Sequence, residues 1–317
     1  MRAARLHRFG APLEVDWIPV PEPAGEEVLV KVVAAGVCHT DLHLIAGAYP
    51  DLPLPRVLGH EIAGVAEGLG DVLVYASWGC GECRLCRRGE EQLCPGAQEA
   101  GWLRDGGYAE YVLVPSRRYL LPLEGLDPVL AAPLADAGVT PYRAVRRMAP
   151  WLEADARVVV IGIGGLGQFA IQYLRLLTKA RIVAVDRDPR KLGRALELGA
   201  AEALEPEDVQ GEARAVLDLV GSDETLALAG RLVGRGGIVA QVGEAGGYIA
   251  TGFGRFPHEA TFTTSVWGTL EELCDVIELA RRGQISWEVE TLPLPAVNQA
   301  LERLRRGDVG GRLVLTP

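Results

Sequence analysis

The feature that most constrains the fold is a glycine-rich turn between a strand pattern and a helix pattern. Arg157 to Ile161 predict a buried strand, and residues 162–167 follow it as Gly-Ile-Gly-Gly-Leu-Gly. Gln168 to Thr178 then have helical periodicity, and a second apolar strand at 181–185 ends beside Asp186. A glycine motif alone is weak evidence. A strand before it, a helix after it and an acid at the end of the next strand are the context in which such a turn binds a dinucleotide.

The physical roles of these residues follow from that context. Gly162 and Gly164 would let the backbone approach a pyrophosphate at the helix N-terminus, and Gly167 would allow close packing of helix on strand. Asp186 would accept hydrogen bonds from the adenosine ribose and repel a 2′-phosphate, which favours NAD over NADP, although Arg187 beside it weakens that preference. A glycine-rich turn without a ligand is the alternative. The predicted cofactor-binding residues of this region are Gly162, Gly164, Gly165, Leu166, Gly167, Asp186, Arg187, Val220 and Val242.

The strand and helix patterns continue to alternate after this unit. Strands are expected at 215–220, 237–242 and 261–267, and helices at about 190–198, 223–233 and 270–282. This alternation predicts a mainly parallel sheet in an α/β domain. The N-terminal region instead has short strand patterns such as Val28 to Val33, and residues 284–317 return to that style, so we expect the two chain ends to share one domain.

Four of the six cysteines crowd into a short segment. Cys80, Cys83, Cys86 and Cys94 have the spacing C-x2-C-x2-C-x7-C, which suits a closed tetrahedral site for a structural zinc ion. Disulfides and an iron–sulfur cluster are the competing explanations. Cys274 lies in a helical pattern, where we expect it to pack as a small apolar residue.

A second cluster of chemically active side chains lies in residues 36–61. Cys38, His60 and Glu61 offer a thiolate, an imidazole and a carboxylate, the ligand types of a catalytic zinc that keeps one position open. The segment after Cys38 predicts a short helix that ends before Gly47, so the simpler roles of Thr40 and Asp41 are those of an N-cap and a first-turn acid.

Composition limits the classes of function. The chain has 317 residues, 49% hydrophobic and 23% charged, enough for two domains with ample core. A net charge of −10 and a pI near 5.1 argue against nucleic acid or an anionic membrane as partner. The first residues lack the apolar core of a signal peptide, and strand, turn and helix explain the uncharged stretch Val158 to Leu174. We therefore expect a cytoplasmic protein.

With these motifs in hand, the chain resembles the zinc-dependent alcohol dehydrogenases of the medium-chain dehydrogenase/reductase superfamily over essentially its whole length. The resemblance implies a GroES-like, β-rich catalytic domain made of residues 1–138 and 268–317, with a structural zinc lobe at 79–96. Residues 139–267 would form a Rossmann domain, a doubly wound parallel sheet that binds NAD. The active site would lie between the domains, and the protein would be a homodimer or homotetramer.

The resemblance also assigns metal ligands. GVCHTDLH is similar to the segment whose cysteine binds the catalytic zinc, which implies that role for Cys38. His60 would be the imidazole ligand, and Glu61 a carboxylate that can join or leave the ion. PLADAGVTPYRAV places Asp136 where many relatives have cysteine, and some bacterial members carry aspartate there. The alternative for Asp136 is an N-cap for a helix that begins near Ala137.

Catalytic roles follow in the same way. Thr40 would contact the substrate oxygen, His43 would end a proton relay, and Asp41 would orient His60 through its second ring nitrogen. Arg312 would reach the cofactor pyrophosphate. Segments 64–75 and 201–220 depart from the family pattern in being short, and the latter leaves little room for a full helix.

The predicted function is zinc-dependent hydride transfer between a primary or secondary alcohol and NAD, with an aldehyde or ketone as product. A polyol or amino-acid-alcohol dehydrogenase is the nearest alternative. A nucleotide-binding protein without catalysis is a more distant one, because it would not need this ligand set.

Overall fold

The computed structural model describes all residues from Met1 to Pro317 and divides them into two compact units. The first consists of Met1–Asp136 and Gly268–Pro317, and the second of Ala137–Trp267. The sequence places the corresponding junctions at 138/139 and 267/268. No helix in either unit combines the length and the hydrophobicity that a membrane span requires.

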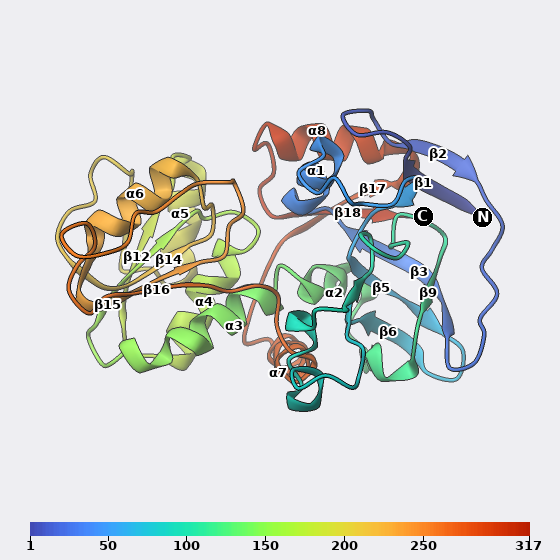
Figure 1. Ribbon diagram of the computed structural model, residues 1–317, viewed down its shortest axis with the longest axis horizontal. Helices are drawn as coiled ribbons and strands as arrows, with labels where there is room; N and C mark the ends of the chain where they lie inside the picture. The colour runs from blue at the N-terminus through green and yellow to red at the C-terminus, as the bar shows by residue number, and fades with distance from the viewer. The chain divides into compact units, whose positions relative to one another are not determined.

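The second unit contains a six-stranded sheet in which every pair of neighbours is parallel (Figure 1). In spatial order its strands are β13 (Glu202–Leu204), β12 (Arg181–Val185), β11 (Arg157–Ile161), β14 (Ala213–Asp218), β15 (Val233–Gln241) and β16 (Thr261–Thr264). The chain thus begins in the middle, moves outward to β13 and then crosses to β14 on the other side. This reversal places a topological switch point at the carboxyl ends of β11 and β14, the place where such sheets bind ligands.

The helices of this unit start and stop at residues suited to those positions. They are α3 (Val139–Met148), α4 (Gly167–Leu177), α5 (Pro189–Leu198) and α6 (Asp223–Leu232), with a 3₁₀ turn, η5, at Ala149–Trp151. Asp188 caps α5, and Gly199 ends it with φ of 111°. Ser222 and Thr225 form a capping box at the start of α6. No helix lies between β13 and β14, as the short segment 201–220 predicted.

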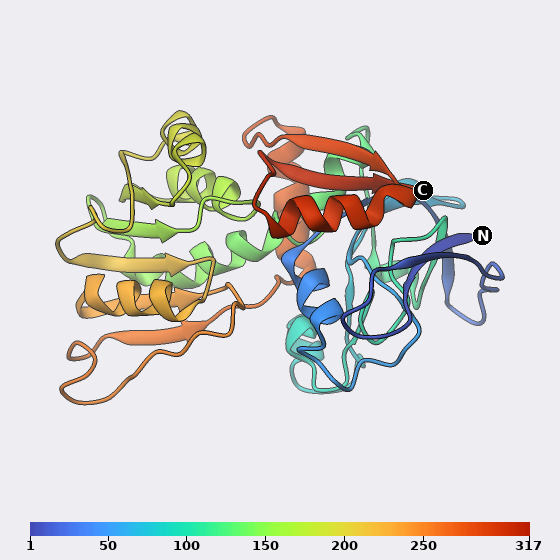
Figure 2. The ribbon, with the colours of Figure 1, turned by 90° about the horizontal axis from the view of Figure 1, so that it is seen from above.

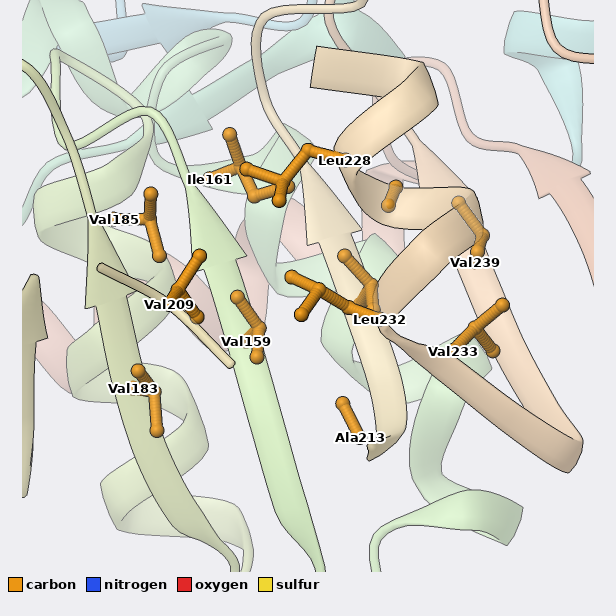
Figure 3. Close-up of a cluster of buried hydrophobic side chains, with 12 residues drawn as sticks. Val159, Ile161, Val183, Val185, Val209, Ala213, Leu228, Leu232, Val233 and Val239 are labelled. Carbon is orange, nitrogen blue, oxygen red and sulfur yellow. The ribbon is translucent and has the colours of Figure 1, made fainter. Parts of the chain in front are cut away.

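The core of the second unit explains why the strand sequences are almost wholly apolar. Alternate residues of adjacent strands, Val159 and Ile161 with Val183 and Val185, face the same side and belong to one buried cluster. Figure 3 shows Leu228 and Leu232 of α6 lying over these strands. The intervening strand residues are buried too, as expected for a parallel sheet covered on both faces.

The first unit is built on a seven-stranded sheet to which both ends of the chain contribute. Along the main path its strands are β10 (Leu120–Pro122), β6 (Gly70–Val74), β5 (Glu61–Ala66), β3 (Val28–Gly36), β18 (Arg312–Thr316) and β17 (Val289–Pro293), and β9 (Tyr111–Val114) also pairs with β3. The C-terminal strand β18 is antiparallel to β3, in register from Val314 opposite Gly36. Strands β5 and β6 form a tight antiparallel hairpin, in register from Ile62 opposite Val74 to Ala66 opposite Gly70.

Smaller elements complete this unit. Two further sheets consist of β2 (Glu14–Trp17), β1 (Arg2–Leu6) and β4 (Arg56–Val57), and of β7 (Ser77–Trp78) with β8 (Gln98–Glu99). The helices are α1 (His39–Ala46), α2 (Pro128–Ala131), α7 (Leu270–Arg281) and α8 (Val297–Arg305), the last alongside β17 and β18 (Figure 2). The 3₁₀ turns are η1 (Cys86–Arg88), η2 (Glu91–Leu93), η3 (Arg117–Tyr119), η4 (Ala132–Ala135) and η6 (Leu294–Ala296).

Two local predictions in this unit are corrected. Helix α1 begins at His39 with Cys38 as its N-cap, so Thr40 does not hold that position, whereas Asp41 is a first-turn acid as predicted. The reason is that the Asp41 carboxylate reaches back to the Cys38 amide from the third helical position, which starts the helix earlier. The predicted end of the helix is confirmed, because Gly47 follows its last residue with φ of 80°. Cys274 is exposed on α7 rather than packed as an apolar residue.

Candidate active site

Three segments of the first unit bring metal-ligand side chains to one point. Cys38 caps α1, His60 immediately precedes β5, and Asp136 follows η4. Their ligand atoms all lie within 4.8 Å of one another. The Asp136 Oδ2 atom lies 3.4 Å from Cys38 Sγ and 3.6 Å from His60 Nε2. The three ligands predicted from separate parts of the sequence therefore meet.

The spacing of these atoms suits a zinc ion. Bonds of about 2.0–2.3 Å in a tetrahedral arrangement separate neighbouring ligand atoms by about 3.3–3.8 Å, which includes both distances measured to Asp136. Three side chains would leave the fourth position open, as in catalytic zinc sites. The residues present therefore fit the ion that the sequence predicts.

The surroundings of His60 favour a positive charge at this point. Burial by itself lowers the pKa of this imidazole, but hydrogen bonding with Asp136 and Cys38 and the charge of Asp41 outweigh burial and raise it well above its ordinary value. An imidazole surrounded in this way takes up a proton when no other cation is present. A divalent cation bound at Nε2 would supply the same charge without the proton.

Glu61 forms a buried ion pair with Arg312 behind this cluster. The guanidinium donates to both carboxylate oxygens of Glu61, and the two residues are 4% or less exposed. Burial raises the pKa of Glu61 to about 7, against the opposing effect of Arg312. Arg312 also lies 3.6 Å from Asp136. The sequence missed this pairing of Arg312, and the contact with a pyrophosphate that it predicted stays a prediction.

Asp41 lies behind His60 and is completely buried. Its Oδ2 atom accepts hydrogen bonds from the Cys38 amide at 2.9 Å and from the Tyr108 hydroxyl at 2.7 Å. The Oδ1 atom faces His60 Nδ1 at 3.8 Å, which is an ion-pair distance and longer than a hydrogen bond. Asp41 thus lies next to the Nδ1 atom of His60, where the predicted orienting role requires it. Tyr108 was not predicted, because a tyrosine within a GGYAEY stretch has no local signal of such a contact.

Two other predicted residues lie on the first helix. Thr40 is half-buried, with Oγ1 3.7 Å from Cys38 Sγ. His43 is also half-buried and lies one turn further along α1, on the same face as Thr40. His39, between Cys38 and Thr40, is exposed.

The alternative role of Asp136 as a helix N-cap is wrong. Helix α3 begins at Val139, its N-cap is Gly138, and no side chain caps it. Asp136 instead follows the last residue of η4, with its carboxylate directed to Cys38 and His60.

The four clustered cysteines form a second candidate metal site. The Sγ atom of Cys86 lies 3.5 Å from that of Cys83 and 3.9 Å from that of Cys80, and Cys83 lies 3.8 Å from Cys94. A tetrahedral zinc with bonds of about 2.3 Å separates its sulfur ligands by about 3.8 Å, so the four thiols fit the ion. All four are free cysteines, which disfavours the disulfide alternative. Backbone amides near Glu82 and Cys83 donate to Cys80 and lower the pKa of its thiol to about 6, which favours the thiolate that a metal binds.

The glycine turn of the second unit has the tight geometry that a phosphate-binding turn needs. Gly162 has φ of 91°, and a side chain there would lie 2.6 Å from the Val220 side chain. A Cβ on Gly167 would lie 2.3 Å from the Gly162 carbonyl oxygen. Both positions therefore require glycine, as predicted. Gly164 has no atom within 4 Å of an added Cβ, and Gly165 and Leu166 are half-buried at the start of α4.

Asp186 lies at the carboxyl end of β12, beside that turn. Its Oδ2 atom accepts a hydrogen bond of 2.7 Å from the Ile163 amide, and Oδ1 accepts one of 3.0 Å from Asp188. The carboxylate thus links the second strand to the turn. Arg187 is exposed.

Val220 and Val242 lie on neighbouring loops that a buried aspartate joins. Asp218 Oδ1 accepts hydrogen bonds from the amides of Val220 and Gly221, and the Asp218 carbonyl accepts one of 2.8 Å from Val242. The structure therefore brings the predicted residues Gly162 and Val220 into contact and places Val242 on the next loop.

Comparison with known proteins accounts for this combination of features. The family model described as the alcohol dehydrogenase GroES-like domain matches residues 24–125, and the zinc-binding dehydrogenase model matches residues 165–282. An NAD-dependent alcohol dehydrogenase of Sulfurisphaera tokodaii is 38% identical, with all of both chains covered. The chain belongs to the medium-chain dehydrogenase/reductase family.

Other relatives of this dehydrogenase agree with that assignment. A D-arabinose 1-dehydrogenase (NADP(+)) of Saccharolobus solfataricus is 38% identical and covers 100% of this chain and 97% of its own. The crystal structure of the alcohol dehydrogenase from Aeropyrum pernix is 35% identical, with a TM-score of 0.94 and all of both chains covered. These matches confirm the predicted α/β architecture, with a GroES-like domain and a Rossmann domain.

Proposed function

We propose that this dehydrogenase transfers a hydride between an alcohol and NAD, with a zinc ion held by Cys38, His60 and Asp136. The observation that carries the proposal is the convergence of a thiol, an imidazole and a carboxylate from three distant segments. Cys38 Sγ and His60 Nε2 both lie within 3.6 Å of one oxygen of Asp136. Such a set is costly to bury without a cation, because burial penalises each charge.

The chemistry is divided between the bound groups and the chain. Zinc would supply a Lewis acid that lowers the pKa of the alcohol oxygen, and NAD would supply the hydride acceptor. Thr40, next to Cys38, offers a hydroxyl that can hold the substrate oxygen and take its proton. His43, on the same helix face and partly exposed, is suited to pass that proton to water as a general base. Glu61 is paired with Arg312, and its carboxylate would join the zinc only by leaving that pair.

Asp186 supports NAD as the cofactor. Its carboxylate lies at the end of β12, where the ribose of a dinucleotide binds in this fold. A negative charge there repels a 2′-phosphate, whereas the exposed Arg187 would attract one. The relatives include both an NAD-dependent and an NADP-dependent enzyme by name. We therefore assign the choice of NAD in this chain to the charge of Asp186.

The substrate is proposed as a small alcohol, with the aldehyde or ketone as product. A sugar or polyol is the second candidate, because one 38% identical relative is named a D-arabinose 1-dehydrogenase. We also propose a homodimer or homotetramer in the cytoplasm, where a reducing environment would keep the four clustered thiols free to bind zinc. Neither nucleic acid nor a membrane is proposed as a partner, given the charge of −10.

One experiment tests the core of this proposal. The purified enzyme is assayed for NAD and NADP reduction with primary, secondary and poly-alcohols, and zinc is counted per chain in parallel. We expect one zinc for each of the two sites and NAD-dependent turnover that is lost when the catalytic zinc is removed. Cys38→Ser should lose both that zinc and turnover while retaining NAD binding. Full activity in a preparation that lacks the catalytic zinc would refute the proposed role of Cys38, His60 and Asp136.

A further inference from the structure

The carboxylate of Asp41 is bound asymmetrically. It is completely buried, and its Oδ2 atom accepts both of the hydrogen bonds that the structure gives it, from the Cys38 amide and the Tyr108 hydroxyl. Its Oδ1 atom has no hydrogen-bond partner and lies 3.8 Å from His60 Nδ1. A buried carboxylate oxygen without a donor is costly and calls for an explanation. The nearest available donor is the ring of His60, once its Nδ1 carries a proton.

Tyr108 is held rigidly where it meets Asp41. Its amide donates to Leu58 at 3.0 Å, and the preceding residue, Gly107, donates to Gly59 at 2.8 Å. Its ring packs so closely on Gly59 that an added Cβ there would lie 2.5 Å from a ring carbon. Tyr108 is thus fixed to the segment that carries His60, while its hydroxyl contacts Asp41 in the segment that carries Cys38.

The Tyr108 hydroxyl can act only as a donor to Asp41. Burial, and then the negative charge of Asp41, raise the pKa of Tyr108 well above its ordinary value, so the phenol remains protonated. A charge-assisted hydrogen bond of 2.7 Å is among the stronger kinds in proteins. The second contact of the hydroxyl, with the Gly36 carbonyl oxygen, is longer at 3.3 Å.

We propose that Tyr108 is a positioning residue for the catalytic metal: its hydroxyl holds one oxygen of Asp41 so that the other faces His60 Nδ1 and fixes the imidazole as a zinc ligand. The inference rests on the proposed zinc role of Cys38, His60 and Asp136. It adds an outer residue that joins two ligand-bearing segments through one hydrogen bond. Such outer partners fix the tautomer and orientation of a histidine ligand.

A purely structural role is the competing explanation, because the ring of Tyr108 also fills space against Gly59. Tyr108→Phe separates the two roles, since it keeps the ring and removes only the hydroxyl. Tyr75→Phe is the matched control. Tyr75 is equally buried in the same unit, and its hydroxyl donates to the Gly268 carbonyl oxygen at 2.8 Å rather than to Asp41.

The test measures zinc affinity at the catalytic site by chelator competition, with the visible spectrum of the cobalt-substituted site as a second readout. Loss of an outer partner typically weakens metal binding by about 10- to 100-fold. Because Tyr108 acts through Asp41, we expect Tyr108→Phe to weaken catalytic zinc binding by about tenfold and to shift the cobalt spectrum. Tyr75→Phe should leave both unchanged, and zinc at the four cysteines should be retained in both variants.

A double-mutant cycle decides whether the effect passes through Asp41. In an Asp41→Asn background, Tyr108→Phe should have little further effect on zinc affinity. An equal loss in both backgrounds, or an unchanged affinity in Tyr108→Phe alone, would overturn the inference. Failure of the proposed function would be recognised separately, because the unaltered protein would then bind no zinc beyond that of the four cysteines.

Discussion

The buried pair between Arg312 and Glu61 allows a quantitative prediction about stability. Replacing Arg312 by Met keeps much of the side-chain volume and removes the positive charge. Glu61 then loses the guanidinium group at a position that is 0% exposed. Removing one partner of a buried ion pair typically costs about 3–5 kcal/mol. We expect the lower end, about 3 kcal/mol, because Glu61 can accept a proton instead of remaining charged.

The cost should depend on pH in a defined direction. Burial raises the pKa of Glu61 to about 7 even with Arg312 present, and loss of Arg312 removes an effect that lowers it. An acid whose pKa is raised in the folded state binds its proton more tightly there than in the unfolded chain. Stability therefore falls as pH rises from the unfolded pKa to the folded one. The folded-state pKa of Glu61 is higher in the variant, so its stability falls over a wider pH range. Each pH unit by which this range is extended costs the variant about 1.4 kcal/mol relative to wild type.

Calorimetry of the zinc-loaded enzyme at pH 6 and pH 8 measures both effects. A loss of about 3 kcal/mol lowers the melting temperature of a unit of this size by about 6–12 °C, and the loss should be larger at pH 8. Adding Glu61→Gln to Arg312→Met should restore most of the stability, because it removes the buried negative charge that Arg312 balances. Arg303→Met is the control, since its pair with Glu290 is partly exposed and should cost about 1 kcal/mol or less. The reasoning fails if the double variant is no more stable than Arg312→Met.

Three further predictions concern the two metal sites and the cofactor. Cys38→Ser should abolish turnover and leave the dissociation constant for NAD within about twofold, measured by protein fluorescence; strong residual turnover would count against Cys38 as a ligand. Asp186→Ala should raise the Michaelis constant for NAD by about tenfold and lower the preference for NAD over NADP, because it removes charged hydrogen-bond acceptors worth about 1.5–3 kcal/mol each; an unchanged ratio would show that the ribose contact is misplaced. Cys86→Ala should release the zinc of the four-cysteine site to a chelator and make residues 79–96 sensitive to protease, while the catalytic zinc remains; a protease-resistant segment without zinc would contradict this.

The sequence alone determined the features that depend on local spacing. The C-x2-C-x2-C-x7-C pattern placed four thiols within reach of one ion, because few bonds separate them along the chain. The strand, the glycine turn and Asp186 predicted the strand–turn–helix unit in the same way, since the period of the apolar residues shows which segments are strand and which are helix. Strands β11 and β12 have the predicted bounds for this reason.

Only the tertiary structure decided which distant groups meet. Nothing near Arg312 in the sequence indicates that it pairs with Glu61, because that contact depends on β18 joining β3 from the other end of the chain. Tyr108 reaches Asp41 for the same kind of reason, through a segment that packs on Gly59. From the sequence, Asp136 was equally compatible with a helix cap. In the structure it follows the turn η4, and its carboxylate lies beside Cys38 and His60. The partner of a buried charge is the oppositely charged group that lies nearest to it, and the packing of the whole unit determines which group that is.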